Sequence, residues 1–251
     1  MSYNPTPTVP LPHLRELKVT LWHLEEAALV QHLLYPIETE VTLLWQNSDF
    51  LHVDHSALFA RAMQTLHRTR GSFTISHCHI ALDDHAASLF LGSNTASSYG
   101  IHIDFYPRDA HRLCDTLYKQ GFLADVDRLQ YHMLSGQHFM DHTGLLQGAT
   151  RVRTLELMRL DVMDQIALCA SDVPFPELQH LIIVPPPRLG GSVLPITSKT
   201  KHAVLGLDDF LRGRRSVEHP IRDLTLCPSA QIPHLITKIR KDMPELALHL
   251  T

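Results

Sequence analysis

The sequence lacks several features that would assign the protein to a broad class. Its 251 residues hold 22 Lys and Arg against 26 Asp and Glu, a formal net charge of −4, so no basic excess attracts nucleic acid or anionic lipid. No apolar run approaches the ~20 residues that span a bilayer, and the first residues resemble no secretory signal. We therefore expect a cytoplasmic or nuclear protein that binds neither nucleic acid nor membrane.

Cysteine is scarce and unpaired. The four cysteines are Cys78, Cys114, Cys169 and Cys227, and none belongs to a C-x-x-C pair. Their spacing indicates reduced, intracellular thiols rather than a disulfide framework. The H-E-x-x-H, G-x-S-x-G, P-loop and G-x-G-x-x-G motifs are missing as well. We expect no catalytic residue, no bound metal and no cofactor, so the protein is predicted not to be an enzyme.

What the sequence does contain is a recurring strand pattern, apolar-x-x-apolar-x-apolar. The central apolar residues of nine candidate strands are Leu17, Leu43, Ile75, Ile103, Leu129, Leu155, Leu181, Leu224 and Leu248. Six of the eight intervals between them lie within the 20–29 residues of a leucine-rich repeat. The longest interval contains a Pro- and Gly-rich run and a polar run, which we interpret as a loop inserted at about 185–203.

The segments between these strands favour helices. Helical spacing or helix boundary signals mark residues 23–34, 56–69, 107–120, 161–170, 204–212 and 232–241. Strands alternating with helices indicate a parallel sheet. Strands buried on both faces would be continuously apolar, whereas Glu16 and Lys18 flank Leu17, so one sheet face should meet solvent.

The sequence therefore predicts an α/β leucine-rich-repeat-like solenoid. This horseshoe would carry parallel strands on its concave side and helices on its convex side. Residues 1–11 are Pro-rich and expected to be extended or disordered, because proline cannot continue a helix. Residues 12–251 are expected to form a single irregular, monomeric repeat domain.

Four segments resemble a known family. They are the opening at residues 11–19, the segment 33–43, its partial repeat at 175–181, and the segment 205–226. Together they resemble the leucine-rich-repeat region of fungal F-box proteins, over roughly residues 11–243. The resemblance implies the target-recognition part of a substrate receptor in a cullin–RING ubiquitin ligase. The residues before Leu11 are too few for the family's F-box helices, so we expect adaptor binding only if an F-box lies outside this chain.

The concave face is the predicted partner-binding surface. Its candidate contact residues are Glu16, Lys18, Thr154, Glu156, Met158, His180, Ile182, Asp223 and Thr225. Met158 and Ile182 are apolar where solvent is expected, which indicates a contact patch. A loop such as 185–203 folded over them would explain their character equally well.

Histidine is unusually common, with 19 residues. His77 and His79 point to the same side if they lie on a strand, and with Asp83 they form the alternative hypothesis, an intracellular hydrolase or metal-dependent enzyme. The simpler interpretation, which we favour, places them at a strand end beside solvated loop residues. A third possibility is a decaying repeat domain of marginal stability, because the central strands keep the pattern poorly.

Overall fold

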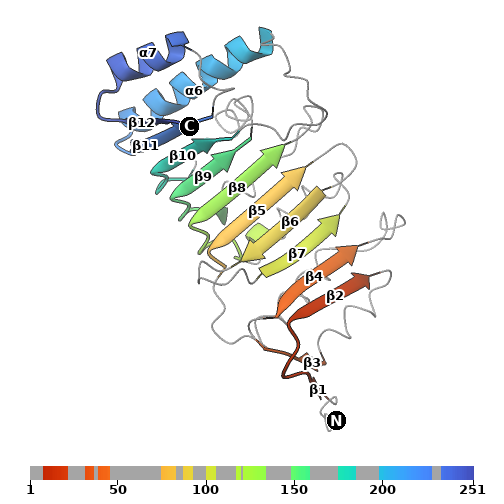
Figure 1. The fold of residues 1–251 in the computed structure, drawn as a ribbon. Coiled ribbons are helices and arrows are strands. Elements are labelled where there is room, and N and C mark those ends of the chain that lie inside the picture. Colours follow the sequence, from red (N-terminus) through yellow and green to blue (C-terminus); the bar gives the residue numbers. More distant parts are fainter. Residues whose placement is uncertain are drawn as a thin grey trace.

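The structure, a computed structural model, is a mixed α/β fold built on one open, mostly parallel sheet. It describes residues 8–21, 32–36, 39–45, 75–82, 87–92, 100–105, 117–119, 121–133, 148–158, 175–184, 198–227 and 233–251. The ten strands of the sheet follow the order β12-β11-β10-β9-β8-β5-β6-β7-β4-β2 (Figure 1). No helix within the described ranges is long and apolar enough to cross a membrane.

The strands of the sheet match most of the predicted centres. They are β2 (Glu16–Leu21), β4 (Glu40–Trp45), β5 (His77–Leu82), β6 (Ala87–Gly92), β7 (Gly100–Phe105), β8 (Arg128–Met133), β9 (Thr154–Leu157), β10 (His180–Ile183), β11 (Asp223–Leu226) and β12 (Ala247–Leu250). Eight of the nine predicted central residues fall inside a strand. The exception is Ile75, which lies two residues before β5 and is buried at 4% exposure.

The C-terminal half of the sheet is regular. Strands β8 to β12 lie side by side in chain order, and each pairs in parallel with the next. The same backbone contact recurs where each strand begins, since the amides of Arg153 and Thr154 both donate to the carbonyl of Asp127. The amides of Gln179 and His180 repeat this contact with the carbonyl of Arg153. This repetition aligns the central leucines of neighbouring strands.

A tight turn precedes several of these strands. Its hydrogen bond runs from the amide of Val126 to the carbonyl of Leu123, and equivalent bonds join Val152 to Ala149 and Leu178 to Phe175. Phe175 adopts φ 50°, a backbone conformation that is costly for a bulky residue. Because both ends of each turn are apolar and buried, the turn closes the core at the strand entrance.

A buried arginine supports the turn before β10. The guanidinium of Arg214, only 2% exposed, donates to the carbonyl oxygens of Phe175 at 3.0 Å and Leu178 at 3.1 Å. Burial lowers the pKa of Arg214 to about 10. Two neighbouring arginines also form ion pairs, Arg212 with the buried Asp208 and Arg215 with the exposed Glu245. The arginines of residues 212–215 therefore all make contacts within the fold.

Two helices cover the C-terminal end of the sheet (Figure 1). They are α6 (Ser198–Ser216) and α7 (Pro233–Asp242), and their buried side chains belong to the same core cluster as β11. The helix predicted at 232–241 is confirmed as α7, and it starts at Pro233, a residue that suits the first helical position. The predicted loop at 185–203 is wrong over residues 198–203, which are helical because Ser198 suits a helix start and the following lysines and alanine favour helix.

The sequence also mispredicted residues Leu33 and Leu34 as the end of a helix. They form the two-residue strand β3 (Leu33–Leu34), which pairs in parallel with β1 (Val9–Pro10). Tyr35 precedes Pro36, and a residue before proline favours an extended backbone. Within the predicted segment 107–120, residues 117–119 are helical, and Gly121 follows them at φ 71°, the left-handed conformation in which many helices end. The predicted helices at 56–69 and 161–170 lie outside the described residues.

The middle of the sheet departs from chain order. Strand β6 is antiparallel to β5 and β7, and this three-stranded meander returns toward β4 (Figure 1). As a result β7 pairs with β4, while β5 pairs with β8. Strand β6 had not been predicted. It follows β5 after only four residues, and so short a connection joins antiparallel neighbours.

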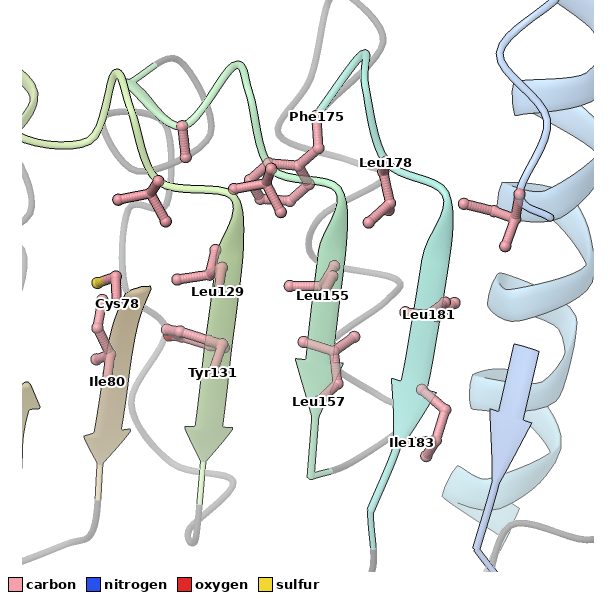
Figure 2. Close-up of a cluster of buried hydrophobic side chains, with 14 of the residues drawn as sticks. Cys78, Ile80, Leu129, Tyr131, Leu155, Leu157, Phe175, Leu178, Leu181 and Ile183 are labelled. Carbon is pink, nitrogen blue, oxygen red and sulfur yellow. The ribbon is translucent and has the colours of Figure 1, made fainter. Parts of the chain in front are cut away.

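The core lies on one face of the sheet. Figure 2 shows Cys78 and Ile80 of β5, Leu129 and Tyr131 of β8, and Leu155 of β9 with their side chains on this common side. Leu129 and Leu155 are 0% exposed, and burying each leucine contributes roughly 1.5–3 kcal/mol. The opposite side of these same strands carries the alternating polar residues, where candidate functional groups are found.

Candidate functional site

A continuous row of side chains crosses the face opposite the core. The pairing registers place ten residues in line, one per strand: Lys18, Thr42, His102, Phe90, His79, Gln130, Glu156, Ile182, Thr225 and His249. A second row runs beside it through His77, Arg128, Thr154, His180, Asp223 and Ala247. We call this side the polar face. It carries two hydrogen-bonded clusters, each centred on one carboxylate.

The predicted contact residues divide between two places on this face. Glu16 and Lys18 are exposed on β2, at the far end of the sheet from the others. The other residues of the set that lie within strands come together on β9, β10 and β11. Their proposed role in binding a partner stays a prediction.

The expected exposure was wrong for two of these residues. Glu156 and Met158 are each only 8% exposed. Glu156 is covered because three side chains gather around its carboxylate. Met158 follows the last residue of β9, so the alternation of the strand no longer decides which side it faces. Ile182, the other apolar member, is partly exposed.

Glu156 is the centre of the larger cluster, which we call the Glu156 network. Its Oε2 accepts hydrogen bonds from Arg128 at 3.1 Å and from Nε2 of Gln130 at 2.8 Å. Its Oε1 lies 3.0 Å from Nε2 of His132. Both carboxylate oxygens are therefore engaged, by donors that all belong to the neighbouring strand β8.

Two histidines of β5 extend this network by one step. Nε2 of His77 lies 2.8 Å from Oε1 of Gln130, and Nε2 of His79 lies 3.0 Å from Nδ1 of His132. The network thus consists of two arms that meet at the carboxylate. The relay arm runs from His79 through His132 to Glu156, and the amide arm runs from His77 through Gln130 to Glu156.

The charge states within the network follow from these contacts. The hydrogen bond from His132 lowers the pKa of Glu156 to about 2, assisted by Gln130 and Arg128 and opposed by burial. Burial, assisted by the neighbouring His132 and His77, lowers the pKa of His79 to about 4. At neutral pH Glu156 is therefore an anion and His79 a neutral imidazole.

The alternative site at His77, His79 and Asp83 is only partly described, since Asp83 lies outside the described residues. His77 and His79 do share one face of β5, as expected, but each ring is held by a side chain of β8. Among the residues that the structure describes, no group of three or more His, Cys, Asp or Glu is placed to hold a metal ion. The geometry here supports hydrogen bonding rather than coordination.

A second cluster on the polar face has similar components. Oδ2 of Asp223 lies 2.9 Å from Nδ1 of His180. Its other oxygen, Oδ1, lies 3.3 Å from Nε2 of His249. These side chains are much more open than those of the Glu156 network, with 45% of His180, 56% of His249 and 33% of Asp223 exposed. We call this group the Asp223 cluster.

The relay arm contains the side-chain types of acid–base chemistry, but the described residues place no nucleophile beside it. It has the form imidazole, imidazole, carboxylate, and histidine and glutamate are common general acids and bases. No hydroxyl or thiol of the described residues is hydrogen-bonded to either histidine of β5. The low pKa of His79 also makes it a weak base at neutral pH.

Sequence reasoning missed Arg128, Gln130 and His132 as members of a site. They lie more than 45 residues from His77 and His79, and only the pairing of β5 with β8 brings them together. Aligning Cys78 and Ile80 with Leu129 and Tyr131 as equivalent core positions would have placed His79 beside Gln130.

Comparisons of this chain with models of protein families, with curated proteins and with solved structures found no match. The function proposed below consequently depends on the geometry of the polar face and on the sequence resemblance described above.

Proposed function

We propose that this chain is a non-catalytic protein-binding domain, organised as an irregular leucine-rich-repeat-like solenoid, whose polar face recognises a protein partner. One observation carries the proposal. Strands β8 to β12 advance in chain order with matching register, so equivalent positions of successive strands present a broad array of side chains. Repeat proteins use such extended surfaces to bind macromolecules.

The resemblance to fungal F-box proteins makes the proposal more specific. It favours the target-recognition part of a ubiquitin-ligase substrate receptor, which would bind the ligase adaptor only if an F-box lies outside this chain. The β5–β7 meander is a departure from a simple repeat order. In this proposal the meander is an insertion that joins two repeat segments, β2–β4 and β8–β12.

The experiment compares proteins captured from a lysate by three forms of the chain. Thr225→Arg places a large cation on the polar face, at a partly exposed position of β11. Thr237→Arg makes the same exchange at an exposed position of α7 and is the matched control. A protein captured by the wild type and the control but not by Thr225→Arg supports the proposal, provided that all three forms have the same melting temperature.

Two other results have clear meanings. If every captured protein survives Thr225→Arg, the polar face of β11 is not the recognition surface. Recovery of specific partners with no ligase adaptor, from cells expressing the longest available transcript, would remove the ubiquitin-ligase part and leave a binding domain acting alone.

A further inference from the structure

We draw no further inference here: the strongest candidate, the outer edge of β12 at the end of the sheet, where Leu250 is 41% exposed although the equivalent Leu226 of β11 is buried, carries nothing because no contact or charge among the described residues shows what covers it.

Discussion

The Glu156 network and the Asp223 cluster are built from nearly the same parts and differ mainly in burial. Each has one carboxylate that contacts imidazole nitrogens across neighbouring strands. The side chain of Glu156 is 11% exposed, whereas that of Asp223 is 33% exposed. Burial makes each hydrogen bond of the Glu156 network obligatory, because water cannot replace a missing partner. The Asp223 cluster can exchange its partners for water.

Removing the two carboxylates should separate the clusters most clearly. Glu156→Ala should cost about 3 kcal/mol of unfolding free energy, because it leaves the donors of Gln130 and His132 unpaired in a partly buried site. Asp223→Ala should cost about 0.5 kcal/mol, since its histidines are near half exposed. Urea denaturation of both variants at pH 7 measures the difference. Equal losses of unfolding free energy in the two variants would show that burial does not make the Glu156 network more stabilising than the Asp223 cluster.

Acid should weaken the Glu156 network in two stages. The pKa of His79 is lowered from 6.5 to about 4, so its contribution is complete above pH 6.5 and is lost as pH falls toward 4. The pKa of Glu156 is lowered from 4.5 to about 2, so its contribution is complete above pH 4.5 and is lost as pH falls toward 2. Together these losses should reach on the order of 3 kcal/mol between pH 7 and pH 3.

Urea midpoints measured at pH 7, 5 and 3 test this expectation. Glu156→Gln should lack the second stage, because an amide does not titrate in this range. Asp223→Asn is the comparison variant at the open cluster. If Glu156→Gln follows the same acid profile as the wild type, another carboxylate is responsible for the loss.

Pairwise coupling gives a smaller contrast between the clusters. A double-mutant cycle on Glu156 and His132 should yield a coupling free energy of about 1 kcal/mol. The same cycle on Asp223 and His180 should yield about 0.3 kcal/mol, because both side chains of that pair are partly exposed to solvent. Single and double alanine variants, measured by urea denaturation, complete both cycles. A larger coupling at Asp223 would contradict the role given to burial.

The regular half of the sheet was predictable because its signal is local. Alternation around Leu129, Leu155, Leu181 and Leu224 identifies both the strand and its buried side, and these strands follow in chain order. The meander was not predictable from the same signal. The sequence at β6 fits the pattern through Ala86, Leu89 and Leu91, but an assumed interval of about 26 residues left no room for a strand directly after β5.

The candidate site was predicted only in pieces for a related reason. His77 and His79 were chosen for their spacing, and Glu156 was chosen as an exposed position of a different strand. Their connection depends on β5 pairing with β8, which the irregular strand order decides. Sequence patterns fix which way a side chain faces, but they do not fix which distant strand lies beside it. The sequence consequently predicted an exposed Glu156, whereas three side chains of β8 contact and cover its carboxylate.

Salt should produce the smallest of these contrasts. Raising NaCl from about 0.05 M to about 1 M screens exposed charges within a few ångströms, while buried pairs are screened much less. The cost of Asp223→Ala should therefore shrink toward zero at high salt, while the cost of Glu156→Ala should change by less than about 0.5 kcal/mol. Paired urea titrations at pH 7 measure both values. A strong salt effect at Glu156 would mean that solvent reaches the carboxylate, and burial would then no longer distinguish the Glu156 network from the Asp223 cluster.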